Sequence, residues 1–198
     1  MLGAPLLGRF NASNLMAVLA VLLVEGWSLD KALARLAETS PVPGRMERFG
    51  KEAGPLLVVD YAHTPDALRQ ALGALHEHCS GDLWCVFGCG GDRDRGKRPV
   101  MGRIAEELAQ HLVVTDDNPR SENGDDIIRD ILQGLERPEG AVVERDRNAA
   151  VRLAYDRAAA DDLILVAGKG HASYQHIASQ RLAPSEPALA RSPTAGGE

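Results

Sequence analysis

The sequence predicts an α/β domain with a doubly wound, mostly parallel sheet, preceded by two helices. After residue 44, short and continuously apolar runs alternate with stretches of helical pattern. This alternation is typical of parallel strands that are covered by helices on both faces. Before residue 40 the chain has helical pattern only. The segment Ser40–Gly44, with two prolines and a glycine, separates the two parts and is the predicted domain boundary.

Two helices are expected in the first part. Asn11 or Ser13 can cap a helix that runs to about Val24, and Ser28 can cap a second helix, Leu29–Glu38. The apolar run in the first helix is far shorter than the roughly 20 residues that a membrane-spanning helix needs. No signal-peptide cleavage site follows it. We therefore expect a buried helix here rather than a membrane anchor.

The second part contains the alternating elements. The strand-like runs are short and apolar: Leu56–Val59, Leu83–Phe87, Leu112–Thr115, Val142–Val143 and Leu163–Val166. The helical stretches lie between them: Pro65–His78, Pro99–Gln110, Asp125–Leu135 and Asn148–Ala160. A last edge strand is expected at Gln180–Leu182. The predicted domains are therefore residues 1–40 and 41–190, followed by a disordered tail at 191–198.

The composition excludes several classes of protein. With 44% hydrophobic and 25% charged residues, the 198-residue chain is expected to be globular. A net charge of −6 argues against a nucleic-acid-binding protein. Cys79, Cys85 and Cys89 are odd in number and lack C-x-x-C spacing, which indicates free thiols in a reducing compartment and so a cytoplasmic protein. No metal site is predicted, because His76, His78 and Cys79 are too crowded for a usual zinc site.

Polar clusters follow four of the five expected strands. They begin at Asp60, Gly88, Asp116 and Gly168 and are rich in Gly, Asp, Arg or His. Ligands of doubly wound sheets bind beyond the carboxyl ends of the strands. These clusters are therefore expected to form a polar pocket for a charged, zwitterionic or phosphorylated ligand.

The glycine-rich loop after the second strand has the spacing of a phosphate-binding loop. Gly91 to Lys97 satisfies G-x-x-x-x-G-K, but Arg98 stands where a Ser or Thr would hold Mg²⁺. Pro99 also removes an N–H donor from the start of the following helix. A phosphate-binding loop is therefore disfavoured. Two alternatives remain: a flexible loop with solvated charges, or a loop whose bend lets Arg93 reach a carboxylate.

Arg120 is the sharpest candidate for ligand recognition. Pro119 fixes the turn, so Arg120 leaves it in a defined direction. A guanidinium group can then bind a carboxylate through two hydrogen bonds. Asp117 and Asn118 could bind an amino-acid head group. The alternative, an ordinary turn in which Asp117 caps the next element, is equally supported by the sequence alone.

Three further residues have a structural and a functional interpretation. His63 and His171 are explained more simply as loop histidines bonded to backbone groups than as catalytic residues. Asp60 ends an apolar strand, where a carboxylate can bind a ribose hydroxyl or a second cation. It can equally cap the helix that starts at Pro65.

Six motifs resemble one family in order and spacing, the UDP-N-acetylmuramoyl-L-alanyl-D-glutamate–2,6-diaminopimelate ligases, a branch of the Mur ligases. They extend from about Leu7 to Leu182 and comprise Gly8-Arg9-Phe10-Asn11-Ala12-Ser13-Asn14, Gly44-Arg45-Met46-Glu47, Asp60-Tyr61-Ala62-His63-Thr64-Pro65, the glycine-rich loop, Asp117-Asn118-Pro119-Arg120 and Gly168-Lys169-Gly170-His171. The family has a UDP-sugar domain, a central ATPase domain and a C-terminal Rossmann-like domain. The resemblance implies that residues 1–40 are the end of the central domain and 41–190 the C-terminal domain.

The resemblance also implies ATP-dependent amide ligation in peptidoglycan synthesis. The γ-carboxylate of D-glutamate in UDP-MurNAc-L-Ala-D-Glu is phosphorylated by ATP and then attacked by an amine of meso-diaminopimelate. Contacts with ATP are implied for Asn11, Asn14, Arg45, Asp60 and His63. Contacts with diaminopimelate are implied for Arg93, Asp117, Asn118, Pro119, Arg120, Gly168 and Ala172. The Asp-Asn-Pro-Arg motif is associated with diaminopimelate rather than lysine, in agreement with the physical argument for Arg120, because lysine lacks the second carboxylate.

The chain departs from the family pattern in two respects. The family's phosphate-binding loop, magnesium ligands and modified lysine have no counterpart in this sequence. We therefore expect the Mg²⁺ ligands in the central domain, and we expect this chain alone to be inactive. Ala172 stands where the family usually has a glutamate that pairs with a substrate ammonium group. Losing such a bond costs roughly 1.5–3 kcal/mol, so Ala172→Glu is expected to strengthen binding of diaminopimelate.

Two other functions remain open on the sequence alone. One is a non-catalytic module that binds an amino acid or a nucleotide. The other is a Mur ligase for another amino acid, such as lysine, or a relative of the folate-polyglutamate ligases. Arg120 argues against lysine, and the D-Y-A-H-T-P match argues against the folate branch.

Overall fold

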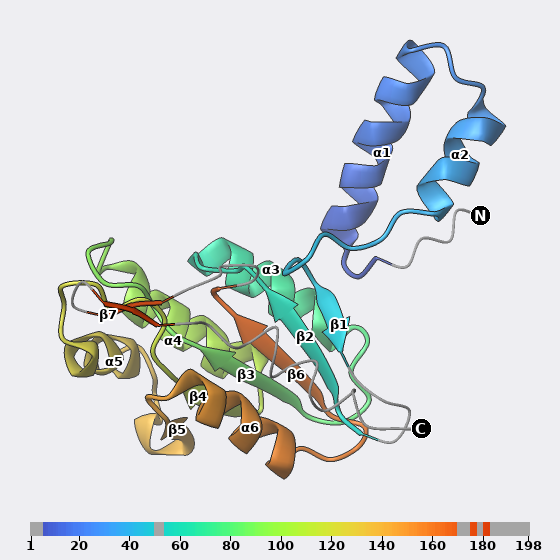
Figure 1. The fold of residues 1–198 in the computed structure, drawn as a ribbon. Coiled ribbons are helices and arrows are strands. Elements are labelled where there is room, and N and C mark those ends of the chain that lie inside the picture. Colours follow the sequence, from blue (N-terminus) through green and yellow to red (C-terminus); the bar gives the residue numbers. More distant parts are fainter. Residues whose placement is uncertain (1–5, 50–53, 170–174, 178–179, 183–198) are drawn as a thin grey trace. The chain divides into compact units, whose positions relative to one another are not determined.

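The computed structural model describes residues 6–49, 54–169, 175–177 and 180–182 (Figure 1). The chain divides into two compact units, residues 1–42 and 43–198, here called unit 1 and unit 2. Unit 1 consists of two helices that pack against each other, α1 (Arg9–Val24) and α2 (Leu29–Ala37). None of the helices in the described part of the chain has the length and apolar character needed to cross a membrane.

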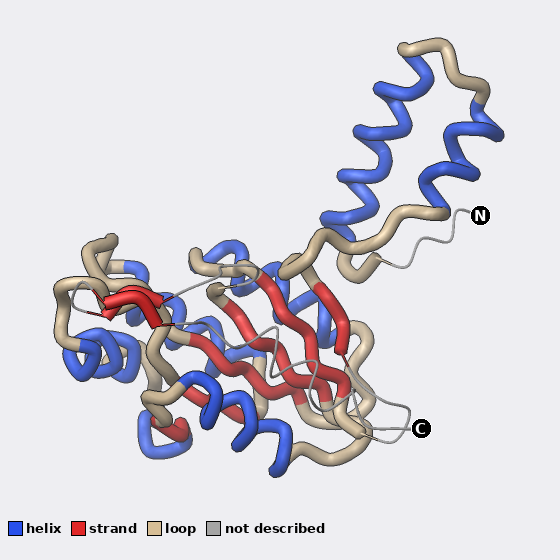
Figure 2. The backbone as a smooth tube through the Cα atoms, in the orientation of Figure 1, coloured by secondary structure: helices blue, strands red, loops and turns tan. Residues whose placement is uncertain are grey.

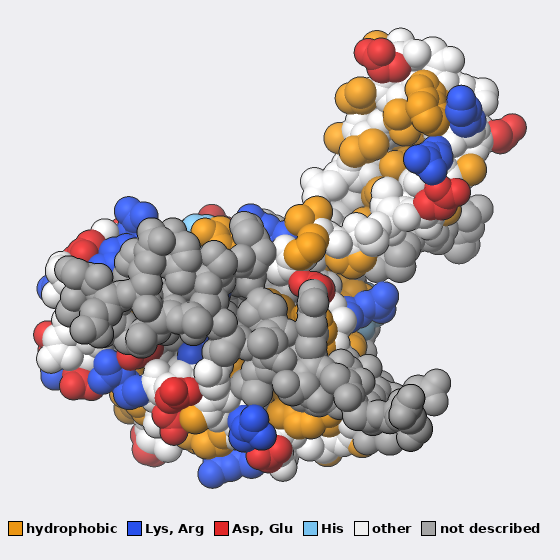
Figure 3. All heavy atoms as spheres, in the orientation of Figure 1, with side chains coloured by type: hydrophobic (Ala, Val, Ile, Leu, Met, Phe, Trp, Pro, Cys, Tyr) orange, Lys and Arg blue, Asp and Glu red, His pale blue; other side chains and the backbone are white. Residues whose placement is uncertain are grey.

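Helix α1 is predicted correctly as a helix, but two details of the prediction are wrong. It begins after Gly8, whose φ of 89° only glycine adopts readily, so Asn11 and Ser13 lie inside the helix and do not cap it. Its apolar side chains are also largely exposed, with Met16 at 64% and Val24 at 86%. A single partner helix can cover only one face of α1, and Figure 3 shows hydrophobic side chains on the surface of this unit.

Unit 2 is built on a six-stranded sheet (Figure 2). In spatial order the strands are β1 (Glu47–Phe49), β2 (Leu56–Asp60), β6 (Leu163–Ala167), β3 (Leu83–Phe87), β4 (His111–Val114) and β5 (Ala141–Val143). Strand β1 is antiparallel to β2, and all other neighbours are parallel. The doubly wound, mostly parallel sheet that the sequence predicts is thus confirmed.

Helices cover both faces of this sheet. Helix α6 (Arg147–Arg157) packs through Ala150 and Ala154 against Trp84, Val86 and Ile164. Side chains alternate between the faces of a strand, so the intervening residues point to the opposite layer. That layer contains α3 (Pro65–His76), α4 (Lys97–Leu108) and α5 (Gly124–Leu132), which lie side by side (Figure 1).

Two strands differ from the prediction. Strand β1 was not expected, because Glu47-Arg48-Phe49 has no apolar run and is held by its pairing with β2. Gln180–Leu182 is a strand, β8, but it pairs with β7 (Gln175–Ile177) in a separate two-stranded sheet instead of forming an edge of the main one. The predicted disordered tail, residues 191–198, lies outside the described residues.

The strand order gathers the polar loops at one edge of the sheet. Strand β6 lies between β2 and β3, and β4 follows β3. These four strands are parallel, so their carboxyl ends at Asp60, Phe87, Val114 and Ala167 lie on the same edge. The loops that follow them are the four polar clusters of the sequence.

Candidate functional site

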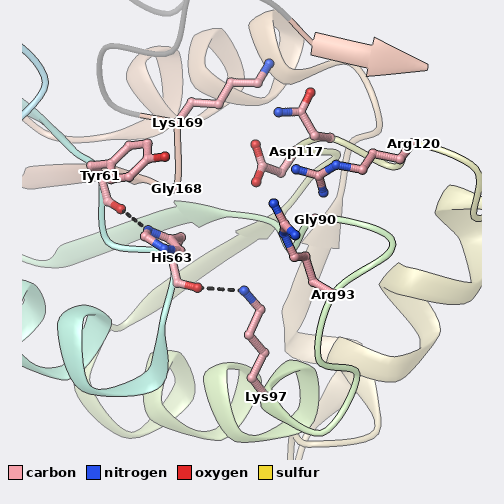
Figure 4. Close-up of a pocket in the computed structure, with 10 residues that line it drawn as sticks. Tyr61, His63, Gly90, Arg93, Lys97, Asp117, Arg120, Gly168 and Lys169 are labelled. Atoms are coloured by element: carbon pink, nitrogen blue, oxygen red, sulfur yellow. Dashed lines mark hydrogen bonds between the residues drawn. The ribbon is translucent and has the colours of Figure 1, made fainter. Parts of the chain in front are cut away.

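A cavity of about 130 Å³ lies where these loops meet. Figure 4 shows the side chains that surround it. Six residues expected from the sequence line it together: His63, Arg93, Asp117, Asn118, Arg120 and Gly168. Tyr61, Gly90, Lys97 and Lys169 line it as well, although none of them was among the site residues expected from the sequence.

Two guanidinium groups enter this pocket from different loops. Arg93 belongs to the glycine-rich loop and Arg120 to the Asp-Asn-Pro-Arg loop, and Figure 4 shows both pointing toward the same space beside Asp117. Arg120 has a positive φ of 51°, and its Nη1 donates a hydrogen bond to the carbonyl oxygen of Gly91 at 2.5 Å. That bond fixes the direction of Arg120 while leaving its other N–H donors for a ligand.

Asp117 supplies the acceptor of the pocket. Within the described part of the chain its Oδ1 atom is buried and has no hydrogen-bond partner. A buried carboxylate oxygen without a donor is costly in a folded protein, so this atom suits a ligand that carries N–H groups. The alternative helix-cap interpretation of Asp117 is wrong, because Asn123 caps α5 by accepting from the Asp125 N–H at 2.9 Å.

Gly168 and Lys169 follow the central strand β6. Gly168 has a φ of 119°, a conformation that side chains rarely adopt, and its N–H donates to the Asp60 carbonyl at 3.1 Å. Lys169 is 3% exposed. Burial lowers the pKa of Lys169 to about 8, and the positive charge of Arg147 acts in the same direction while Asp117 opposes it. The pocket therefore contains an ammonium group that loses its proton more easily than usual.

His63 is bonded to the backbone, as its simpler interpretation predicts. Its Nδ1 lies 2.8 Å from the Tyr61 carbonyl oxygen, and a carbonyl oxygen can only accept, so Nδ1 carries the hydrogen. The Nε2 atom remains as the other polar atom of the ring. Lys97 donates from Nζ to the His63 carbonyl oxygen at 2.8 Å, which joins this loop to the start of α4.

The Asp60 carboxylate accepts hydrogen bonds from two backbone N–H groups and does not cap a helix. Its Oδ2 accepts from the Met46 N–H at 2.9 Å and its Oδ1 from the Ala62 N–H at 2.8 Å. Burial raises the pKa of Asp60, and these two bonds counteract the rise. The cap of α3 is Thr64. Beside Asp60, the Arg45 guanidinium lies 4.5 Å from the ring centre of Tyr61, a cation–π arrangement at the wall of the pocket.

The glycine-rich loop is held by Arg98, which makes the phosphate-binding interpretation wrong on structural grounds. The Arg98 side chain is fully buried and forms ion pairs with Glu122 and Asp130, both at 2.8 Å. A residue in this position faces away from the pocket and leaves no hydroxyl for a metal ion. The loop is likewise not simply a flexible stretch of solvated charges.

The remaining expected residues lie elsewhere. Asn11 and Asn14 belong to unit 1, where the Asn14 Nδ2 donates to the Asn11 Oδ1 at 3.3 Å. Pro119 is buried but does not line the pocket. Ala172 and His171 lie outside the described residues.

No metal site is found among the residues that the structure describes. They contain no group of three or more His, Cys, Asp or Glu side chains that could hold a metal ion. All three cysteines carry free thiols, as expected. Burial raises the pKa of the Cys85 and Cys89 thiols to about 12. These two are therefore poor nucleophiles and metal ligands.

Comparisons with known proteins agree on one family. Residues 44–170 match the family described as "Mur ligase, glutamate ligase domain". The UDP-N-acetylmuramoyl-L-alanyl-D-glutamate–2,6-diaminopimelate ligase of Vibrio vulnificus is 56% identical over 179 residues, which are 90% of this chain and 36% of the relative. The corresponding ligase of Xanthomonas campestris pv. campestris is 54% identical over 192 residues, 94% of this chain and 38% of the relative. The chain thus spans little more than a third of these relatives.

Solved structures give the same result. A structure of a UDP-N-acetylmuramoyl-L-alanyl-D-glutamate–2,6-diaminopimelate ligase matches with a TM-score of 0.75 at 41% sequence identity. The match covers 97% of this chain and 39% of the ligase chain. The structure of the UDP-N-acetylmuramate–alanine ligase of Thermotoga maritima matches with a TM-score of 0.66 at 23% sequence identity. This match covers 83% of this chain and 35% of the ligase chain. At that identity the likeness concerns the fold alone.

Proposed function

The chain belongs to the Mur ligase family, and from this premise we propose that it is the amino-acid-binding part of an ATP-dependent ligase that adds meso-diaminopimelate to UDP-MurNAc-L-Ala-D-Glu. The observation that carries the proposal is the convergence of Arg93, Arg120 and Asp117 on one cavity. These groups offer donors for carboxylates and an acceptor for an ammonium group.

The chemistry of the pocket matches diaminopimelate better than lysine. Diaminopimelate carries an amino and a carboxylate group at each end. Arg120 and Arg93 are proposed to hold the carboxylates through charge-assisted hydrogen bonds, and Asp117 to accept from an ammonium group. Asn118, Gly168 and Ala172 complete the proposed amino-acid site, and Pro119 fixes the turn that carries Arg120. Lysine would leave one guanidinium group without a carboxylate.

The ATP side of the site is proposed to lie next to this pocket. Arg45 and His63 are proposed to contact ATP directly. Asp60 would act through its hydrogen bonds to the Met46 and Ala62 N–H groups, which hold the segments that carry Arg45 and His63. Asn11 and Asn14 of unit 1 are also proposed to contact ATP, as the family resemblance implies.

The reaction proceeds in two steps. The γ-phosphoryl group of ATP is transferred to the γ-carboxylate of D-glutamate, which gives an acyl phosphate and ADP. The neutral amine of diaminopimelate then attacks the acyl carbon, the C–O bond to phosphate breaks, the nitrogen releases one proton, and an amide and inorganic phosphate form. In Mur ligases Mg²⁺ supports the transferred phosphate charge. The described residues of this chain contain no cluster suited to that ion, so its ligands are proposed to belong to the central domain.

Unit 1 is proposed to be the end of that central domain. A helix that is apolar on all sides is typical of the interior of a larger domain. Helix α1 has this character, and Met16, Val21 and Val24 are exposed in this chain. Without the rest of the catalytic machinery the 198-residue chain is expected to show no ligase activity, and an ATP- and diaminopimelate-dependent rate would contradict this expectation.

Calorimetry with the 198-residue chain tests the proposed amino-acid site. We expect meso-diaminopimelate to bind at least about tenfold more tightly than L-lysine, because one charge-assisted hydrogen-bonded contact is worth roughly 1.5–3 kcal/mol. The control is Arg129→Lys, because Arg129 is an exposed residue of α5 that forms an ion pair with Asp126 and does not line the pocket. This variant should leave both affinities unchanged. Equal affinities for the two amino acids, or no binding of meso-diaminopimelate, would contradict the proposal.

A further inference from the structure

One carboxylate joins the glycine-rich loop to the Asp-Asn-Pro-Arg loop. The Oε1 of Glu122 accepts from the Asp92 N–H at 2.6 Å and from Arg98 Nη2 at 2.8 Å. Its Oε2 accepts from Arg95 Nη2 at 2.7 Å and from Arg98 Nη1 at 3.1 Å. A carboxylate has about four acceptor sites, so Glu122 is saturated by groups from the glycine-rich loop and the start of α4.

A second set of bonds runs between the same two loops. Ser121 donates from Oγ to the Asp92 Oδ1 at 2.6 Å and from its N–H to the Asp92 Oδ2 at 3.2 Å. The Gly91 N–H donates to the Asn118 carbonyl oxygen at 2.7 Å. A methyl group on Gly91 would overlap with the Pro119 carbonyl oxygen, so the two backbones touch here. The loops therefore form one unit, although they follow different strands.

The backbone at the two junctions adopts conformations that need support. Asp92 and Arg120 have φ values of 52° and 51°. Residues other than glycine occupy this left-handed region only when the surrounding contacts hold them there, at a cost of about 1–3 kcal/mol each. One of these residues directly precedes Arg93, and the other carries the second guanidinium group of the pocket. Glu122 and Ser121 form hydrogen bonds with Asp92, and Ser121 directly follows Arg120.

Glu122 is not part of the pocket wall, so its effect on a ligand is indirect. It is bonded to the residue before Arg93, and it lies two positions after Arg120. Arg98, its main partner, is held on the other side by Asp130 of α5. We infer that Glu122 is a positioning residue that sets the spacing between Arg93 and Arg120, and that it thereby determines the preference for an amino acid with two carboxylates. This inference rests on the proposed function.

The variant Glu122→Gln tests this role. Glutamine keeps the shape of the side chain, but it places an amide N–H₂ group against donors and cannot accept all four bonds. We expect the preference for meso-diaminopimelate over L-lysine to fall roughly tenfold, as displacement of a binding group by about an ångström can cost that much or more. The affinity for lysine, which uses only one of the two guanidinium groups, should change less than about twofold.

A matched control is available on the same layer of helices. Glu106 also accepts two backbone N–H bonds across an element boundary, from Glu136 at 2.7 Å and Arg137 at 2.9 Å. It does not line the pocket. Glu106→Gln should lower the free energy of unfolding without changing the ratio of the two affinities. A ratio that shifts equally in both variants would show a general structural effect and overturn the inference.

A milder variant covers the case in which Glu122→Gln does not fold. Ser121→Ala removes the exposed hydrogen bond from the Ser121 Oγ to Asp92. It should shift the affinity ratio in the same direction by about threefold, which corresponds to the free energy of one ordinary hydrogen bond. If the wild-type chain prefers meso-diaminopimelate and each of the two variants that folds keeps that preference, the inference fails while the proposed function stands. A wild-type chain without the preference would contradict the proposed function and, with it, this inference.

Discussion

Two carboxylates on the same loop have opposite environments. Glu122 accepts four hydrogen bonds, and the bonds from Arg98 are the main reason that its pKa falls to about 2. Asp117 has a buried oxygen without a partner in the described part of the chain. The arginines differ in the same way, since Arg98 is enclosed by acidic groups and Arg120 points into the cavity. Charges enclosed by groups of opposite charge stabilise the loops, whereas charges that line the cavity are the ones available to a ligand.

The largest expected effect is on the free energy of unfolding and follows from a change at Arg98. Arg98→Met keeps much of the side-chain volume but leaves Glu122 and Asp130 without their buried partner. Breaking a buried ion pair from one side costs about 3–5 kcal/mol, so the free energy of unfolding should fall by that amount in urea titrations. A loss below about 1 kcal/mol would mean that the network carries little stability.

The second effect is on ligand affinity and follows from a change at Arg120. Arg120→Lys keeps the positive charge but cannot form two parallel hydrogen bonds with a carboxylate. Binding of meso-diaminopimelate, measured by calorimetry, should weaken about 10- to 100-fold, the equivalent of roughly 1.5–3 kcal/mol. The free energy of unfolding should change by less than about 1 kcal/mol, as is usual for partly exposed sites. A stability loss as large as that of Arg98→Met would remove the distinction between the two arginines.

A third effect concerns the pH dependence of stability that Glu122 causes. The pKa of Glu122 is lowered from 4.5 to about 2 in the folded chain. A carboxyl group with a lowered pKa stabilises the folded state above its unfolded pKa, and this stabilisation is lost as the pH falls through the folded value. Between pH 4.5 and 2 the wild-type chain should therefore lose stability more steeply than Glu122→Gln. Parallel acid-unfolding curves for the two chains would contradict this prediction.

The smallest effect compares two glycines. Gly73 lies within α3 with nothing within 4 Å of an added methyl group, so Gly73→Ala should raise the free energy of unfolding by about 0.4–1 kcal/mol. Gly91, where the two loops touch, should respond with the opposite sign, because a methyl group overlaps with the Pro119 carbonyl oxygen. Urea titration of both variants measures this, and a stabilised Gly91→Ala chain would show that the loops can separate freely.

The fold and the meeting of the polar loops at one cavity could be predicted because both depend on local patterns. Apolar runs identify β2, β3, β4 and β6, and the polar clusters that follow them mark the pocket edge. The structural role of the charges outside the pocket could not be predicted. The sequence shows Arg98 only as a missing magnesium ligand, because its partners Glu122 and Asp130 lie 24 and 32 residues away. Lys169 and Tyr61 were missed as pocket residues for the same reason, since their places depend on tertiary structure.

The strand order has a consequence for how the chain folds. Strand β6 is the last strand of the main sheet in sequence and lies between β2 and β3. Among the described residues, β1 pairs with β2, and β3, β4 and β5 pair in a second group; β6 pairs with both β2 and β3 and so joins the two groups. Such late, long-range pairing slows folding and leaves strand edges exposed to other chains. The strand that joins the two parts of the sheet is directly followed by Gly168 and Lys169 of the pocket, so the closed sheet and the complete pocket depend on the same strand pairing.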